Sequence, residues 1–541
     1  MRASGILVHP TSFPSCFGIG DLGQSAYDFL DFLAKSGQRL WQVLPLGPTG
    51  YGHSPYMSYG AMAGNPLLIS PEKLFAQGWI TSEQWHTLPE WAVVQATWPG
   101  RVDYDTVIDF KWGVIRLAYA GFLSRGSAEQ QQHFQDYCQA NQWWLEDFAL
   151  FMALLERYDR QEWTTWDPEL AQRQPAALAQ ARQEHSETIA LHQFAQWAFD
   201  QQWQALKQVA TDYGIQVIGD IPIYVAFNSA DVWANPQLFQ LAEDGQPLRV
   251  AGVPPDYFSA TGQRWGNPLY DWERLKQQDY RWWIQRFQRL LSWVDWVRLD
   301  HFRAFAGYWS IPAEEETAVN GEWVMGPGAD FFASLQRQLG SLPILAEDLG
   351  EITPDVYALR DQFGFPGMKI LEFAFGDDAT NPFLPHNYER NYVVYTGTHD
   401  NDTVVGWFYG DRLDDGQREA VKRYLGGSLS VDGIQWDLIR LAMSAVANWA
   451  LLPLQDVMGL GADSRMNTPG TDQDNWGWRY TADMLHDGIL EKLTQMTTTY
   501  GRIYWHDLEE GRDRVKKRHA PPSEDTDENE GEELTVPNSP T

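Results

Sequence analysis

Three acidic residues at the ends of apolar runs carry the strongest chemical signal in the sequence. Asp300 closes WVRLD, Glu347 follows PILA, and Asp400 lies just after YVVYTG. These runs have the composition of buried parallel strands, whose carboxyl ends meet at one face of a barrel. Two cooperating carboxyl groups are the usual means of breaking a glycosidic bond. The sequence therefore predicts carbohydrate chemistry.

The neighbours of Asp300 and Glu347 predict different roles for the two carboxyl groups. Asp300 lies between Arg298 and His301, and a carboxylate beside a guanidinium stays ionised, as a nucleophile must. A purely structural Arg–Asp ion pair is the alternative. Glu347 has apolar residues before it and Asp348 after it, which raise a carboxyl pKa and suit a proton donor. Its alternative is a charge at a helix N-terminus.

Two further groups have weaker signals. Asp400 and His399 lie among small polar residues after a strand, where they could bind neighbouring sugar hydroxyls, although capping of a turn gives the same pattern. Asp220, in VIGDIPIYV, is predicted to lie at the end of another strand and to orient the other groups. A single aspartate at a strand end leaves that role open.

The elements that must position these residues are eight apolar segments separated by stretches with helical spacing. Alternation of strand and helix predicts a parallel sheet, and carboxylates at the ends of several strands favour a (β/α)8 TIM barrel over an open doubly wound sheet. The segments are GILVHP, LWQVLPL, IQVIGDIPI, WVDWVRL, LPILAE, MKILEF, YVVYTG and PLQDVMGL.

Uneven spacing of the segments predicts large insertions between the strands. We expect a catalytic barrel over residues 1–515, with a mainly helical insertion at 50–205 and a lid or binding loop at 235–275. The loop contains Pro254 and Pro255 and the aromatic residues Tyr257, Phe258 and Trp265. Residues 520–541 hold seven acidic residues and no Lys or Arg, which predicts a disordered tail.

Composition narrows the class of protein. The formal net charge of −32 opposes nucleic-acid binding. No apolar stretch is long enough for a membrane span, and two cysteines fit a reducing compartment, so we expect a cytoplasmic protein. The histidines lack zinc-site spacing; we expect no metal and no cofactor, with a structural calcium left open. A GxGxxG match at Gly18 is separated from the preceding strand by a Ser/Pro loop and lacks the acidic residue of a dinucleotide site.

Several motifs together resemble one family, the amylomaltases. These are bacterial and plastid 4-α-glucanotransferases of glycoside hydrolase family 77, in the α-amylase clan. The resemblance extends over about residues 5 to 505, although the helical insertion carries little of it. The motifs are HPTSFPSCFGIGDLG, WQVLPLGPTGYGHSPY, GDIPIYV, GVPPDYFSATGQRWGNPLY, RLDHFR, AEDLG, YTGTHDND and RMNTPG.

The resemblance implies a role for each matching residue. It implies Asp300 as nucleophile, Glu347 as acid/base and Asp400 as transition-state stabiliser. It places Tyr51 in a second glucan site, and His53 departs from the short polar residue expected within GYGHSPY. The substrate-binding residues that it implies are Ser54, Tyr56, Asp220, Trp265, Arg298, His399 and Asn467.

The expected activity is transfer of α-1,4-glucan segments between maltooligosaccharides or to glucose, with retention of configuration through a covalent intermediate. An α-amylase-like hydrolase would share the carboxylates but pass the intermediate to water. A noncatalytic glucan-binding protein would lack one of them, whereas all three are present. Donor length, formation of large cyclic glucans and the oligomeric state, a monomer or small homo-oligomer, stay open.

Overall fold

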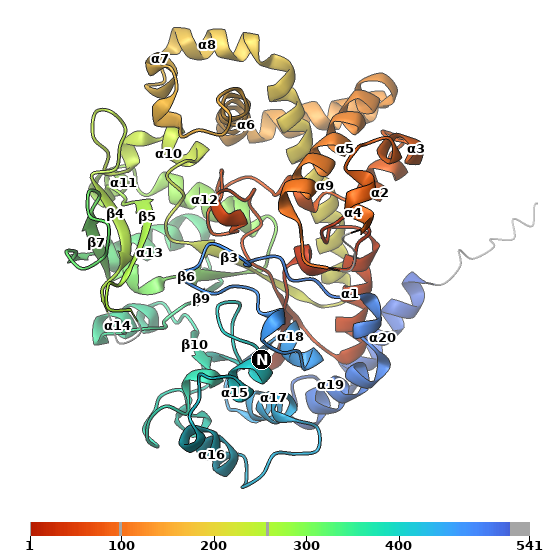
Figure 1. The fold of residues 1–541 in the computed structure, drawn as a ribbon, viewed down its shortest axis with the longest axis vertical. Helices are drawn as coiled ribbons and strands as arrows, with labels where there is room; N and C mark the ends of the chain where they lie inside the picture. The colour runs from red at the N-terminus through yellow and green to blue at the C-terminus, as the bar shows by residue number, and fades with distance from the viewer. Residues whose placement is uncertain (1, 97–99, 256–258, 520–541) are drawn as a thin grey trace, which may run out of the picture.

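The computed structural model describes residues 2–96, 100–255 and 259–519 (Figure 1). The predicted disordered tail at 520–541 lies outside the described residues, as do Tyr257 and Phe258 of the predicted lid. Within the described part, every helix is too short or too polar to cross a lipid bilayer.

Eight parallel strands form a nearly closed barrel, in the spatial order β10, β11, β12, β1, β2, β3, β6, β9. A hydrogen bond of 2.9 Å from the Ala346 N–H to the Pro366 carbonyl joins β9 to the start of β10. The predicted (β/α)8 barrel is therefore confirmed. The strands are β1 (Ala3–Leu7), β2 (Leu40–Gln42), β3 (Gln216–Pro222), β6 (Trp296–Asp300), β9 (Ile344–Ala346), β10 (Gly367–Ile370), β11 (Tyr392–Tyr395) and β12 (Trp449–Pro453).

The prediction for the eighth strand was wrong in position. The strand is WALLP, and the predicted segment PLQDVMGL instead forms helix α18 (Leu454–Met458). WALLP is a continuous apolar run, as a strand buried on both faces requires. In the following segment, Leu454 and Val457 are three residues apart and both buried, which is helical spacing.

Amphipathic helices pack around the barrel. In α12, the buried side chains of Trp283, Phe287 and Leu290 repeat every three or four residues and form one apolar face. The main helices of this layer are α1 (Gln24–Ser36), α9 (Ser186–Asp212), α12 (Arg281–Leu291), α13 (Gly328–Leu339), α14 (Pro354–Gln362) and α17 (Ile434–Ser444).

The segment between β2 and β3 is mostly helical and is orange to yellow in Figure 1. Its longest helix begins with a capping box, in which the Ser127 Oγ accepts from the Gln130 N–H at 3.1 Å and the Gln130 Oε1 accepts from the Ser127 N–H at 2.9 Å. Before α9, the helices are α2 (Pro71–Ala76), α3 (Ser82–His86), α4 (Trp91–Ala96), α5 (Tyr104–Arg125), α6 (Ala128–Arg157), α7 (Pro168–Ala171) and α8 (Pro175–Glu184).

A second, antiparallel sheet stands beside the barrel, in green in Figure 1. Its strands lie in the order β5 (Gln263–Pro268), β4 (Arg249–Val253), β7 (Gly307–Pro312) and β8 (Glu322–Met325). Strands β4 and β5 come from the connection between β3 and β6. Strand β7 follows β6 after one short 3-10 helix (Phe302–Phe305). The sheet therefore joins the predicted lid segment to the chain that leaves Asp300.

The remaining helices connect or close the barrel. Among them, α19 and α20 pack against α1, next to the first strand. These helices are α10 (Ala230–Ala234), α11 (Trp272–Gln277), α15 (Val404–Tyr409), α16 (Asp415–Tyr424), α19 (Asp487–Thr499) and α20 (Trp505–Arg518).

Arg502, between α19 and α20, ties β1 to the last turn of α17 and to the segment between α17 and β12. Its side chain is 1% exposed, and burial lowers the pKa of its guanidinium to about 9. The guanidinium donates to six backbone carbonyls, those of Ala3, Ala442, Met443, Ala445, Ala447 and Asn448. One side chain thus satisfies carbonyls where the first and the last strand of the barrel, β1 and β12, lie side by side.

We predict that Arg502→Met lowers the free energy of unfolding by at least about 3 kcal/mol, because buried carbonyls lose their donor. Urea unfolding followed by circular dichroism would measure the change. The control is Arg337→Met, which removes an exposed ion pair with Asp279; it should change stability by less than about 1 kcal/mol. Equal effects of the two substitutions would contradict the prediction.

Candidate active site

Asp300 and Glu347 lie on adjacent strands of the barrel. Asp300 is the last residue of β6, and Glu347 directly follows β9, which pairs with β6 in parallel. Two backbone hydrogen bonds of 3.1 Å fix the register at this edge: the Glu347 N–H donates to the Leu299 carbonyl, and the Phe302 N–H donates to the Glu347 carbonyl. Strand pairing therefore brings the two predicted catalytic groups together.

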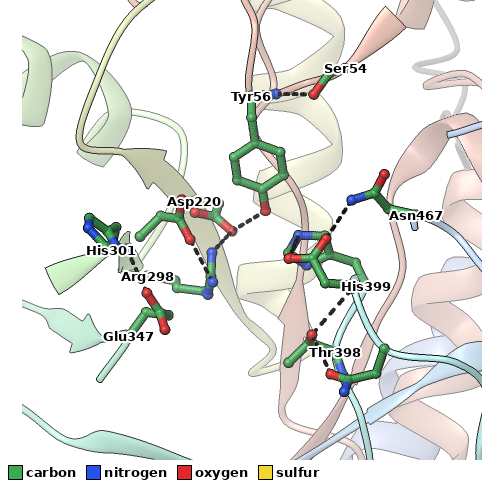
Figure 2. Close-up of polar contacts among 12 residues, drawn as sticks. Ser54, Tyr56, Asp220, Arg298, His301, Glu347, Thr398, His399 and Asn467 are labelled. Atoms are coloured by element: carbon green, nitrogen blue, oxygen red, sulfur yellow. Dashed lines mark hydrogen bonds and ion pairs between the residues drawn. The ribbon is translucent and has the colours of Figure 1, made fainter. Parts of the chain in front are cut away.

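The carboxyl group of Glu347 is buried and held by the backbone. Its Oε2 accepts from the His301 N–H at 2.7 Å (Figure 2). Its Oε1 accepts from the Leu349 N–H at 3.0 Å. Burial, and then the charge of Asp300, raise the pKa of Glu347 well above its usual value, although these two N–H groups and Arg298 oppose the shift. A carboxyl group in this environment suits a general acid.

Arg298 lies between two carboxylates. Its Nη2 is 2.7 Å from the Asp300 Oδ1, and its Nη1 is 2.7 Å from the Asp220 Oδ2. The Asp300 side chain is 28% exposed, whereas that of Asp220 is fully buried. The guanidinium therefore orients the Asp300 carboxylate, and part of that side chain stays accessible to a substrate.

Asp220 supports this arrangement from the fifth position of β3. Its Oδ2 accepts from the Tyr56 hydroxyl at 2.9 Å as well as from Arg298. Burial raises the pKa of Asp220 to about 7, against the opposing effect of Arg298. With no exposed side-chain surface, Asp220 orients Arg298 and Tyr56 rather than reaching the open face of the site.

Asp400 lies on the loop after β11, together with His399. The His399 Nε2 is 3.3 Å from the Asp400 Oδ2, and the Asn467 Nδ2 donates to the Asp400 Oδ1 at 2.6 Å. The Asp400 side chain is 43% exposed. Burial lowers the pKa of His399, which favours the neutral ring. Asp400 thus has fixed partners and still faces the open side of the site.

Tyr56 connects the two halves of the site (Figure 2). Its ring stacks on that of His399, with centroids 5.1 Å apart and planes 13° apart, while its hydroxyl reaches Asp220. The Tyr56 N–H donates to the Ser54 Oγ at 3.2 Å. Tyr56 therefore spans from the Arg298 cluster to the loop of Asp400.

The profile of one protein family, described as 4-α-glucanotransferase, matches residues 8–485. The chain belongs to this family. It is 52% identical over 508 residues to the 4-α-glucanotransferase of a Synechocystis species, covering 93% of this chain and 99% of that one. The Thermus thermophilus 4-α-glucanotransferase is 48% identical over 505 residues, covering 92% and 99%.

Solved structures of similar chains agree with this family assignment. The amylomaltase of Streptococcus agalactiae, solved in complex with acarbose, is 40% identical and superposes with a TM-score of 0.89, covering 93% of this chain and all of that chain. The amylomaltase of Corynebacterium glutamicum is 19% identical with a TM-score of 0.76, covering 92% and 75%, and supports the fold alone.

Two predicted residues of this 4-α-glucanotransferase family member lie away from the Arg298 cluster. Trp265, on β5, places its ring against that of His301 at 4.9 Å and 84°, directly beside the end of β6. Tyr51 is 73% exposed on the loop that carries Tyr56. On the same loop, between Tyr51 and Tyr56, the ring of His53 stacks on that of Tyr104, with centroids 4.3 Å apart and planes 6° apart. The residue that departs from the expected pattern therefore has an aromatic partner.

The structure adds two residues that sequence reasoning missed. Trp476 is buried, with its ring 5.8 Å from that of Tyr56 and 5.9 Å from that of His399. The Arg465 Nη2 donates to the Asp400 carbonyl at 2.5 Å. Arg465 lies within the motif RMNTPG, which was singled out for Asn467 alone, whereas only the folded chain reveals the position of Trp476.

Proposed function

We propose that this chain transfers segments of α-1,4-glucans from one maltooligosaccharide to another or to glucose. The observation that carries the proposal is the contrast between two neighbouring carboxyl groups. Asp300 is reachable and paired with Arg298, whereas Glu347 is buried and has a strongly raised pKa. Such a contrast separates a nucleophile from a proton donor. Family membership supports transfer as the outcome.

In the first step, the protonated Glu347 gives its proton to the bridging oxygen of the donor. The Asp300 carboxylate attacks C1 as the bond between C1 and that oxygen breaks. The released sugar leaves with a free 4-hydroxyl group, and the donor segment is held on Asp300 as a β-linked ester. Asp400 and His399 bind hydroxyl groups of the distorted sugar ring and stabilise the positively charged transition state.

In the second step, the ionised Glu347 takes the proton of the acceptor's 4-hydroxyl group. The acceptor oxygen attacks C1 as the ester bond to Asp300 breaks, which restores an α-1,4 linkage and the protonated Glu347. The backbone N–H groups of His301 and Leu349 stabilise the ionised form between the two steps. Two inversions at C1 give overall retention.

Transfer requires that a sugar hydroxyl group reaches the intermediate before water does. We assign part of this discrimination to Trp265, whose ring lies on His301 next to Asp300. We predict that Trp265→Ala lowers the rate of transfer at least about fivefold more than the rate of hydrolysis. Quantifying longer oligosaccharides and reducing ends released from maltotriose would give both rates.

The control is Trp323→Ala, because Trp323 belongs to the same antiparallel sheet and packs on Trp309 and Arg303 instead. The control should keep the ratio of transfer to hydrolysis of the wild type. An unchanged ratio in Trp265→Ala would contradict the role of Trp265.

Incubation of the purified protein with maltotriose tests the proposed activity. Transfer yields a ladder of longer chains together with shorter ones, which chromatography separates. Only shorter sugars would indicate the hydrolase, and binding of maltodextrin without products would indicate a noncatalytic protein. Either result would overturn the proposal.

We further propose a cytoplasmic enzyme, monomeric or a small homo-oligomer, that uses neither a cofactor nor nucleic acid. The acidic composition supports the last point. We also propose that 50–205 acts as one subdomain built on the barrel of residues 1–515, and that 235–275 acts as the lid. Tyr51 would hold a second glucan chain, since its ring is exposed and flat aromatic rings pack on sugar faces.

A further inference from the structure

A small cavity lies next to the loop that carries Asp400. Residues 396–403 connect β11 to α15. A cavity of about 20 Å³ lies against this loop, lined by Thr398, His399 and Thr403 together with Asp456 and Arg465. A cavity of this size has room for about one water molecule. Apolar residues also line this cavity, so polar contacts and apolar packing together fix the position of the loop.

Asp456 supplies contacts at both ends of this loop. Its Oδ2 accepts from the Thr396 hydroxyl at 2.5 Å, and its Oδ1 accepts from the Val404 N–H at 2.8 Å. Thr396 is the first residue of the loop, and Val404 is the first residue of α15. One carboxyl group, only 1% exposed as a residue, therefore joins the entrance of the loop to its exit.

Asp456 itself belongs to a helix that adjoins the barrel. It lies in the first turn of α18, directly after β12, which pairs with β11. The same stretch of chain continues to Arg465 and Asn467, which contact the Asp400 carbonyl and the Asp400 Oδ1. The segment after β12 therefore contacts Asp400 itself at two points, through Arg465 and Asn467, and the two ends of its loop through Asp456.

We infer that Asp456 is a positioning residue, which places Asp400 for transition-state stabilisation without touching the substrate. The inference rests on the proposed function, in which Asp400 acts on the distorted sugar. Both contacts of Asp456 are hydrogen bonds to donors on the chain, so its shape and acceptor oxygens matter rather than a charge offered to the sugar. An amide could replace it, because a threonine hydroxyl both donates and accepts.

The first test compares Asp456→Ala with Asp456→Asn. The alanine variant should lower kcat for transfer about 100-fold, since misplacing a catalytic group by about 1 Å has effects of this size. KM should change less than about threefold, because Asp400 acts mainly in the transition state. Asp456→Asn should recover activity to within about fivefold of the wild type. Equal loss in both variants would overturn the inference.

The control is Asp437→Ala. Asp437 is also a buried aspartate in the first turn of a helix, and it accepts from the Ser430 N–H at 2.8 Å. It therefore reports the general effect of deleting a buried carboxyl group. Its kcat should stay within about threefold of the wild type. If Asp437→Ala lost as much kcat as Asp456→Ala, the effect at Asp456 would be that of deleting any buried carboxyl group, and the positioning role would be wrong.

A double-mutant cycle with Asp400→Asn separates positioning from stability. If Asp456 acts through Asp400, adding Asp456→Ala to Asp400→Asn should lower kcat less than about threefold further. Multiplication of the two losses would overturn the inference. Should the alanine variant fail to fold, Thr396→Val removes one of the two contacts and goes through the same cycle, with about a tenfold loss expected alone.

The products that the wild-type protein makes from maltotriose show whether the proposed function or only the role of Asp456 is wrong. If wild-type protein makes no ladder from maltotriose, the proposed function is wrong. If it makes the ladder and the cycle is multiplicative, the proposed function stands and only the role of Asp456 is wrong.

Discussion

Asp300→Asn will lower kcat/KM for transfer between maltotriose molecules by about 10⁴-fold or more, because removal of a covalent nucleophile has effects of this size. The amide has almost the same shape as the carboxylate and keeps an oxygen for the Arg298 Nη2, which lies 2.7 Å from the Asp300 Oδ1. The fold and the binding of maltodextrin should therefore survive. Initial rates and calorimetric binding would measure the two properties.

The control for this substitution is Asp295→Asn, just before the opposite end of the same strand. The Asp295 Oδ2 accepts from the Val217 N–H at 2.8 Å and pairs with Lys207 at 3.0 Å, at the amino end of the barrel strands. Activity of the control should stay within about threefold of the wild type, as expected for a site far from the reacting atoms. If Asp300→Asn kept a hundredth of the wild-type activity, Asp300 would not be the nucleophile.

Glu347→Gln should be nearly inactive on maltotriose yet still react with α-maltosyl fluoride. The sugar leaving group needs a proton from Glu347, so the first step should slow by about 10³-fold or more, whereas fluoride leaves without that proton. The second step needs Glu347 as base, and the intermediate should therefore accumulate. Added azide, which attacks without losing a proton, should release α-maltosyl azide. Fluoride release and product analysis would follow both steps.

Glu351→Gln is the matched control for Glu347→Gln. Glu351 is exposed four residues further along, and its backbone carbonyl, which the substitution keeps, accepts from Arg303. It should behave as the wild type on both donors. If azide and the fluoride donor gave no recovery in Glu347→Gln, the acid/base role would have to move to another residue.

The protonation state of Glu347 should make the rate of transfer depend on pH. The first step requires the protonated form, so the rate falls as pH rises through the pKa of Glu347. Burial and Asp300 raise that pKa. The alkaline limb of kcat/KM should therefore lie well above the usual range of a glutamate, and it should be lost in Glu347→Gln.

The barrel and its carboxylates were predictable because each signal is local. A continuous apolar run ending in Asp300 or Glu347 specifies both a buried strand and its carboxyl end. The position of the eighth strand was wrong because PLQDVMGL is apolar too, and its helical spacing was outweighed by composition. Local sequence therefore predicts which groups reach the barrel mouth more reliably than it predicts every strand that forms it.

The supporting contacts of the site could not be predicted in this way. Trp476, Asp456 and Arg465 act on residues at least 50 positions away or through ring packing that only the folded chain creates. The resemblance to a family supplied Tyr56 and Trp265 by matching motifs, and the structure supplies their physical reasons: Tyr56 joins Asp220 to His399, and Trp265 covers His301.

The most direct test of the central claim is to locate the covalent intermediate. Glu347→Gln would be incubated with α-maltosyl fluoride, quenched in acid, digested and analysed by peptide mass spectrometry. We expect one maltosyl group, attached to the carboxyl group of Asp300. A maltosyl group on Asp400 or Asp220, or direct formation of a β-linked product without any adduct, would contradict it.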